Sequence, residues 1–121
     1  MNRRLPTLKD TKISDSELSM RIFIPKDIEY FEGHFEGFHL LPGVVQIAWV
    51  VEFAKSYLKL DGRLKFKGLE NVKFVRPIFP ETEVELNIKF ESVKKVLSFE
   101  YKNSETRLSL GKLKFELPNE F

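Results

Sequence analysis

The sequence contains no cysteine, and this absence removes several kinds of chemistry at once. A disulfide framework, a thiol nucleophile and a cysteine metal cluster are all excluded. The two histidines, His34 and His39, lie five residues apart without clustered carboxylates, so we expect no metal site. We likewise expect no cofactor, and the lack of cysteine fits a cytoplasmic protein.

Long hydrophobic runs are also missing. The longest apolar run extends from Val44 to Val51, is interrupted by Gln46, and is far too short to cross a bilayer. The first ten residues, MNRRLPTLKD, contain two arginines but no apolar stretch behind them, so we expect no signal peptide. These features predict a soluble protein that does not associate with membranes.

An excess of one charge is missing as well. Twenty Lys and Arg against eighteen Asp and Glu leave a formal charge of +2, which is spread along the chain. This distribution argues against nucleic acid as a partner. In contrast, hydrophobic residues make up 42% of the 121 residues and include twelve phenylalanines, which predicts one folded domain over residues 1–121.

Apolar residues alternate with polar ones in several segments, as is typical of half-buried strands. We expect strands at Glu17–Pro25, at Thr82–Phe90 and around Leu97–Tyr101, and one or two strands between Arg63 and Arg76. In the last predicted strand the alternation changes phase near Gly111, which predicts a β-bulge there.

The segment between the first strand and the second half of the chain differs. We expect a long loop from Lys26 to Pro42 and then a helix from Gly43 to Leu60, ended by Asp61-Gly62. On this helix a narrow polar stripe, which contains Glu52 and Lys55, interrupts an otherwise apolar circumference. One buried helix followed by a meander of strands predicts an α+β domain in which a curved antiparallel sheet wraps the helix. Because a small sheet has exposed edges, we also expect a homodimer.

The stretch FEGHFEGFHLLPGVVQIAWVVE contains the best candidate for chemistry. His34 has a side chain suited to moving protons near neutral pH. Eight residues later, Pro42-Gly43 opens the helix, whose first turn offers unpaired N–H groups and a partial positive charge. A base and an oxyanion site together suit proton abstraction next to a carbonyl. The alternative is an ordinary turn that contains an imidazole, and we interpret His39 as structural.

The strings GHFEGFHLLPGVVQIAWVVEFA and GLENVKFVRPIFPETEVEL resemble the active-site segment and the arginine-proline turn of one family, the hotdog-fold 3-hydroxyacyl-[acyl carrier protein] dehydratases (FabZ- and FabA-like). The resemblance covers roughly Leu18 to Leu117. With Gln46 and Trp49 in the helix, the sequence is most similar to the ApeI-like branch, which is associated with aryl polyene synthesis. The resemblance implies the hotdog fold and an acyl-thioester substrate held on an acyl carrier protein or on coenzyme A.

The resemblance also implies roles for particular residues. His34 matches the catalytic histidine that removes the proton at C2 of the substrate. Gly43 and Val44 match the backbone donors that hold the thioester carbonyl, and Phe35 and Gly37 match substrate-binding positions of the motif. Beside the arginine-proline turn, Lys73 and Arg76 are candidates for contacting an acidic carrier protein, and the ordinary alternative is a solvated strand face.

One position departs from the family pattern. The acid that helps the hydroxyl leave sits fourteen residues after the histidine in the family, on the helix of the other subunit, and here that position is Ala48. Loss of an acid typically costs about 10²–10⁴ in rate. The nearest helix carboxylate is Glu52, one turn further on, which is a candidate replacement acid or the partner of a solvated ion pair with Lys55.

Three functions therefore stay open. The first is a reversible dehydratase that interconverts 3-hydroxyacyl and trans-2-enoyl thioesters, with His34 as base. The second is a thioesterase, in which Glu52 or Gln46 directs a water to the carbonyl. The third is a non-catalytic acyl-binding subunit, or one half of a heterodimer whose partner provides the acid that Ala48 lacks.

Overall fold

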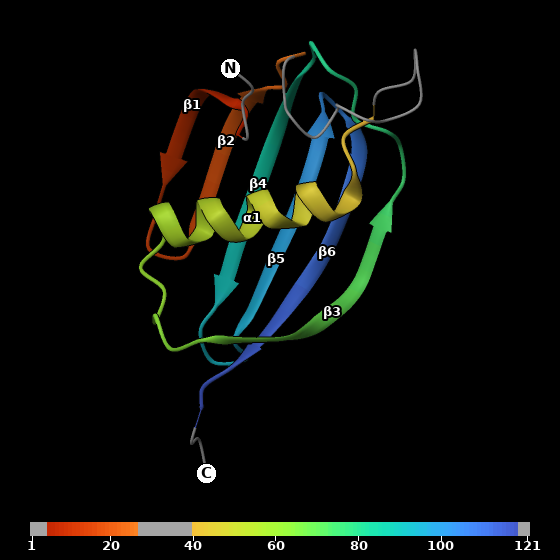
Figure 1. Ribbon diagram of the computed structural model, residues 1–121. Helices are drawn as coiled ribbons and strands as arrows, with labels where there is room; N and C mark the ends of the chain where they lie inside the picture. The colour runs from red at the N-terminus through yellow and green to blue at the C-terminus, as the bar shows by residue number, and fades with distance from the viewer. Residues whose placement is uncertain (1–4, 27–39, 119–121) are drawn as a thin grey trace.

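A computed structural model describes residues 5–26 and 40–118, which form one helix lying across the concave face of an antiparallel sheet (Figure 1). The sheet has six strands in the order β1-β2-β4-β5-β6-β3. The α+β architecture expected from the sequence is confirmed, and the arrangement is that of the hotdog fold. In chain order the elements are β1 (Thr7–Ile13), β2 (Glu17–Phe23), α1 (Gly43–Tyr57), β3 (Lys65–Phe74), β4 (Glu83–Glu91), β5 (Val96–Asn103) and β6 (Thr106–Glu116).

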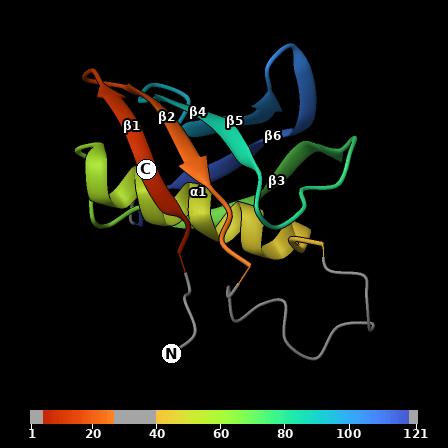
Figure 2. The same ribbon diagram turned by 90° about the horizontal axis from the view of Figure 1, so that it is seen from above.

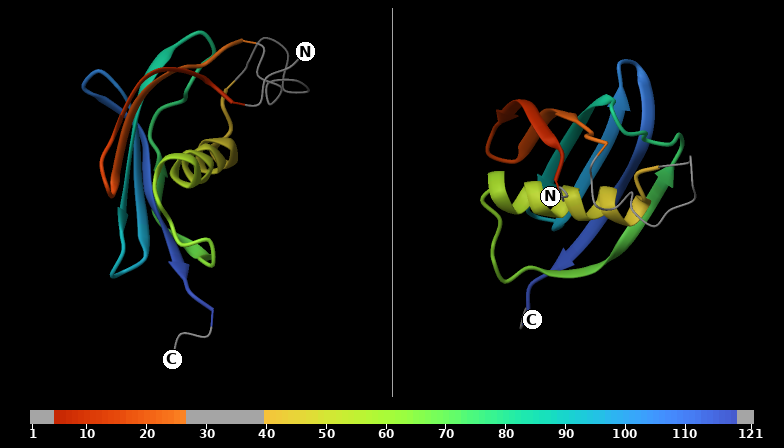
Figure 3. Two further views of the ribbon diagram at one scale, coloured as in Figure 1. Left: turned by 90° about the vertical axis from the view of Figure 1, so that its left-hand side faces the viewer. Right: turned by 45° about the horizontal axis from the view of Figure 1, so that its top comes forward.

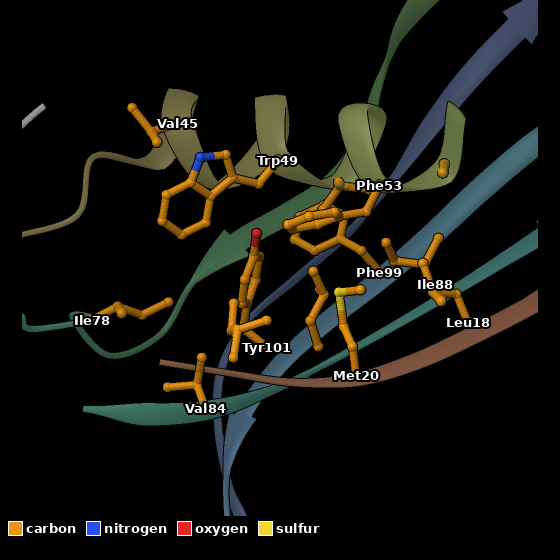
Figure 4. Packing of buried hydrophobic residues seen from close by; sticks show 14 of the residues in the cluster. Leu18, Met20, Val45, Trp49, Phe53, Ile78, Val84, Ile88, Phe99 and Tyr101 are labelled. Atoms are coloured by element: carbon orange, nitrogen blue, oxygen red, sulfur yellow. The ribbon is translucent and has the colours of Figure 1, made fainter. Parts of the chain in front are cut away.

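The core lies between α1 and the inner face of the sheet, which bends around the helix (Figures 2 and 3). The predicted alternation is confirmed in β4 and β5, whose inward residues are buried while their neighbours are partly or fully exposed. Trp49 and Phe53 extend from α1 into this core, and Tyr101 meets them from β5 (Figure 4). None of the helices in the described ranges is long and apolar enough to cross a membrane.

Three details of the sequence prediction are wrong. The strand β1 was not expected, because six of its seven residues are exposed and give no alternation. The helix ends at Tyr57 and not at Leu60, since Leu58 adopts an extended conformation (φ −103°, ψ 145°) and is buried. Asp61 instead closes the following turn, where its carboxylate accepts hydrogen bonds from the backbone and side chain of Arg63.

The change of phase in β6 lies three residues before the predicted bulge at Gly111. Tyr101 pairs with Ser109 and Lys102 pairs with Arg107, so the unpaired extra residue is Leu108. Position 111 requires a glycine for a reason other than a bulge. A Cβ built on Gly111 would lie 2.6 Å from Val72 Cγ2 and 2.9 Å from Val72 Cα. Gly111 therefore lets β3 approach β6 closely.

Strand β3 lies at one end of the sheet and pairs only with β6 in the part of the chain that the structure describes. Its apolar side chains are consequently half exposed: Phe66, Leu69 and Phe74 retain 57%, 49% and 50% of their accessible surface. We call these three residues the β3 apolar row. An exposed row of this kind on a free strand edge is typical of a surface that another chain covers.

Candidate functional site

The first turn of α1, which we call the open turn, has two backbone amides without a hydrogen-bond partner among the described residues. Pro42 precedes the helix and provides no side-chain cap, and its carbonyl accepts hydrogen bonds from the amides of Val45 and Gln46. The N–H groups of Gly43 and Val44 have no hydrogen-bond partner among the described residues. Since the N-terminus of a helix also carries a partial positive charge, these two amides can receive an oxygen that gains negative charge.

The end of β3 lies against this turn (Figure 1). A Cβ built on Gly43 would come within 2.5 Å of Phe74 Cζ and within 2.9 Å of two further ring atoms. The glycine is thus required by a close approach, and the half-exposed ring of Phe74 forms one wall beside the helix amides.

Three buried side chains with polar groups lie behind the open turn, those of Gln46, Ser109 and Tyr101. We call these residues the buried polar cluster. The Ser109 hydroxyl donates to Gln46 Oε1 at 2.7 Å, and Gln46 Nε2 donates to the carbonyl of Leu41 at 3.1 Å. The Tyr101 hydroxyl points from the sheet toward the helix (Figure 4) and donates to the Gln46 carbonyl at 2.7 Å. Burial raises the pKa of Tyr101 well above its ordinary value, so the phenol stays protonated and remains a donor.

The sequence analysis missed this cluster as a unit, although a glutamine inside an apolar helix run was a signal for it. The structure also argues against the suggestion that Gln46 directs a water in a thioesterase. Gln46 is 3% exposed, and both ends of its amide are already occupied by protein groups.

Three of the predicted site residues, His34, Phe35 and Gly37, lie outside the described residues, as does His39. The structure places the remaining ones on the first half and middle of α1. Val44 is 75% exposed, although it belongs to the apolar run of a helix that the sequence predicted to be buried. Val44, Ala48, Glu52, Lys55 and Ser56 form one exposed stripe that runs along the helix from the open turn.

Glu52 is exposed and forms no ion pair among the described residues, so the predicted pair with Lys55 is not formed there. Ala48, at the position where the resemblance implies an acid, is exposed on the same stripe. Neither position faces the core of its own subunit. A group that reached the reacting atoms from this stripe would therefore act on a substrate held against the outside of the helix.

One hollow, an open notch of about 570 Å³, lies between the β5–β6 hairpin and the segment after β3, and it is lined by Arg76, Phe79, Ser104 and Thr106 among others. A second hollow of about 390 Å³ lies beneath the other end of α1, where Val51, Ala54, Leu97 and Phe115 form apolar walls.

Comparison with known proteins gives consistent results. The model of the ApeI-like family, described as ApeI dehydratase, matches residues 10–112. A 3-hydroxyacyl-[acyl-carrier-protein] dehydratase FabZ of Erythrobacter litoralis is 33% identical over 98 residues, which cover 72% of this chain and 65% of the relative. The chain thus spans about two thirds of that relative's length.

Two solved structures are similar over nearly their whole length. The dehydratase heterocomplex ApeI:P from Xenorhabdus doucetiae aligns with a TM-score of 0.84 and 30% identity, covering 92% of this chain and 97% of the other. An uncharacterized protein from Erwinia carotovora aligns with a TM-score of 0.78 and 32% identity, covering 96% and 99%.

Proposed function

Because the chain belongs to the ApeI-like dehydratase family, we propose that it catalyses the reversible dehydration of 3-hydroxyacyl thioesters to trans-2-enoyl thioesters. The observation that supports this proposal is the uncapped first turn of α1, where the Gly43 and Val44 amides lie beside Phe74 and have no hydrogen-bond partner in the part of the chain that the structure describes. FabZ relatives and an ApeI-containing complex support fatty acid or aryl polyene synthesis as the setting.

The proposed reaction begins at C2 of the substrate. His34 removes the C2 proton, and the thioester oxygen gains negative charge that the N–H groups of Gly43 and Val44 receive. The C3–O bond then breaks, the C2=C3 double bond forms, and the hydroxyl takes a proton from an acid and leaves as water. A single preorganised donor at such an oxygen is worth about 10²–10³ in rate, so two open amides are a substantial contribution. Phe35 and Gly37 are proposed to contact the substrate beside His34.

Since Ala48 occupies the position of the family's acid, we propose Glu52 as the acid in this chain. Its carboxylate lies one turn beyond Ala48 on the same exposed stripe, about 6 Å along the helix axis. Since no described residue pairs with Glu52, its carboxyl group is available to a substrate that binds on the outside of α1.

We propose that two subunits associate through the β3 edge, as a homodimer. Pairing there would cover the β3 apolar row and place the second subunit over the exposed stripe of α1. That stripe includes Val44, an apolar residue that is 75% exposed. Leu69→Lys should then shift the sedimentation of the protein toward the monomer. Ile13→Lys, at a residue of similar exposure on the opposite edge strand β1, is the matched control and should leave association unchanged.

A specific observation favours a second candidate, in which the partner is a different, acid-bearing subunit. Strand β3 contains three lysines, Lys65, Lys67 and Lys73, and one acidic residue, Glu70. The Glu70 carboxylate already contacts Lys114 Nζ at 3.2 Å. Two copies of this edge would bring their lysines together, whereas an acidic partner edge would be attracted. Such a partner would also provide the acid that Ala48 lacks.

The substrate is proposed to arrive on an acyl carrier protein or on coenzyme A in the cytoplasm. Lys73 and Arg76 are exposed and form no ion pair among the described residues, so they remain available to an acidic carrier. Replacing both with glutamine should raise KM for a carrier-bound substrate and leave KM for a short pantetheine thioester unchanged.

The direct test measures conversion of a 3-hydroxyacyl thioester to the enoyl product in both directions. The wild type is compared with His34→Ala, Glu52→Gln and Ala48→Asp, and with Ser56→Ala as a control on the same stripe. Loss of turnover in the first two variants only would support the homodimeric dehydratase. An inactive wild type that gains activity in Ala48→Asp would support the second candidate, and four inactive variants beside an inactive wild type would refute the dehydratase proposal.

A further inference from the structure

The buried polar cluster fixes the peptide unit that precedes the open turn of α1. Two of its members, Gln46 and Ser109, have 3% and 0% of their surface exposed. Burying an amide is costly unless its hydrogen bonds are formed, and here both ends of the Gln46 amide are satisfied. Through these hydrogen bonds the cluster also holds a segment of backbone in place.

What it holds is Leu41. The Leu41 carbonyl accepts the hydrogen bond from Gln46 Nε2 at 3.1 Å, and the Leu41 N–H donates to the Ile78 carbonyl at 2.9 Å. The Ser109 hydroxyl matters because it donates to Gln46 Oε1 and so turns the NH₂ end of the amide toward Leu41. Leu41 is thereby anchored through both of its backbone groups, the N–H to the distant Ile78 and the carbonyl to the nearby Gln46 side chain, which Ser109 holds in turn.

Proline transmits this anchoring to the helix amides. The ring of Pro42 holds φ at −61°, so one rotation, ψ at 147°, separates the Leu41–Pro42 peptide unit from the Gly43 N–H. That rotation is itself held, because the Pro42 carbonyl accepts hydrogen bonds from Val45 and Gln46 at 3.1 Å each. Once Leu41 is fixed, the direction of the Gly43 N–H is therefore fixed as well.

We infer that Gln46, oriented by Ser109, is a positioning residue that sets the direction of the Gly43 and Val44 amides toward the substrate oxygen. The inference rests on the proposed function of these amides as the oxyanion site. Gln46 acts through the backbone and does not touch the substrate. Because displacement of a reacting group by about 1 Å can cost about 10² in rate, loss of this anchor should lower kcat more than it raises KM.

The sharpest variant is Gln46→Glu, which keeps the shape of the side chain. A protonated carboxyl group can accept from Ser109 through one oxygen and donate to the Leu41 carbonyl through the other, as the amide does. Burial raises the pKa of such a carboxyl group, so it should be protonated at mildly acidic pH and ionise as the pH rises. Once ionised, it presents an acceptor to the Leu41 carbonyl and the anchor is lost.

Dehydration kinetics and N–H vector directions from residual dipolar couplings of Gly43 and Val44 test the inference together. We expect Gln46→Glu to have nearly wild-type kcat at low pH and to lose roughly tenfold to a hundredfold as pH rises, while the wild type does not. Gln46→Met and Ser109→Ala should lower kcat at every pH and turn the two vectors. Ser98→Ala, on the neighbouring strand β5 and facing away from the core, should change neither.

Unchanged vectors in Gln46→Met, or a Gln46→Glu pH profile identical to that of the wild type, would overturn the inference. The proposed function fails separately. If the wild type dehydrates no acyl thioester, the dipolar couplings still decide whether Gln46 sets the amide directions. If Gln46→Met does not fold, Gln46→Glu measured along pH and Ser109→Ala provide the same comparison.

Discussion

The contact between Gly43 and Phe74 leads to a prediction that needs no substrate. An alanine methyl at position 43 would lie 2.5 Å from Phe74 Cζ, about 1 Å closer than an ordinary carbon contact. Either the Phe74 ring must swing away from α1 or the end of β3 must shift. Overpacking of this kind typically costs about 1–3 kcal/mol, and because Phe74 is half exposed and can swing outward, we expect the lower half of that range.

Chemical denaturation at one fixed protein concentration measures this effect, since association would add to the apparent stability. Gly43→Ala should lower the free energy of unfolding by about 1–2 kcal/mol. Gly68→Ala is the matched control, because a Cβ at that position in β3 meets nothing within 4 Å. Adding Phe74→Leu to Gly43→Ala should recover part of the loss, because the shorter side chain leaves room for the methyl group.

The reasoning would be refuted if Gly43→Ala were as stable as Gly68→Ala, or if the double variant lost the full sum of the two single effects. A separate outcome concerns the site. If Gly43→Ala keeps its stability in the Phe74→Leu background but loses turnover, the glycine is also needed for access of the thioester to the helix amides.

Three further predictions concern the core and one exposed turn. Tyr101→Phe removes the hydroxyl that donates to the helix and should cost about 0.5–1.5 kcal/mol in a denaturation experiment. Gly111→Ala should destabilise the protein by about 3 kcal/mol or prevent folding, because the new methyl would meet the backbone of Val72 at 2.9 Å, and backbone yields less than a side chain. Hydrogen bonds from Arg63 lower the pKa of Asp61 from 3.8 to about 2. The stabilisation from that pair is therefore present above pH 4 and lost as the pH falls toward 2. In Arg63→Gln the pKa of Asp61, measured by NMR titration, should return toward its ordinary value.

The sequence predicted those elements whose residues alternate against a buried face. β4 and β5 fall within a residue or two of their expected ranges, because every second side chain in them enters the core. β1 could not be found in this way, since its backbone pairs with β2 while six of its side chains remain in solvent. Its pairing is a property of the main chain, and main-chain hydrogen bonds leave little trace in the sequence pattern.

The site could be predicted from the sequence only in part, for a related reason. Pro42-Gly43 before an apolar run is a local signal for a helix start, and α1 does begin at Gly43. The approach of Phe74 to Gly43 and the hydrogen bond from Ser109 to Gln46 join residues 31 and 63 positions apart, so no local pattern contains them. A glycine can be required by a neighbour that only the folded chain brings close.

The exposed stripe of α1 also limits where the chemistry can occur. A proton donor at position 48 or 52 points away from the core of its own subunit. The open amides of Gly43 and Val44 lie on the same helix, just over one turn from position 48 and just over two turns from position 52. A substrate carbonyl held by those amides would extend along the outside of α1, where a single subunit provides only one wall. The β3 apolar row runs beside that wall and is half exposed, because a single subunit leaves it uncovered. Covering both surfaces with another subunit would enclose the substrate and remove water from the amides, which strengthens their interaction with a developing oxyanion. Because Ala48 cannot donate a proton, such a site needs a proton donor from another position. Either Glu52 or a residue of the covering subunit must provide it on the enclosed side.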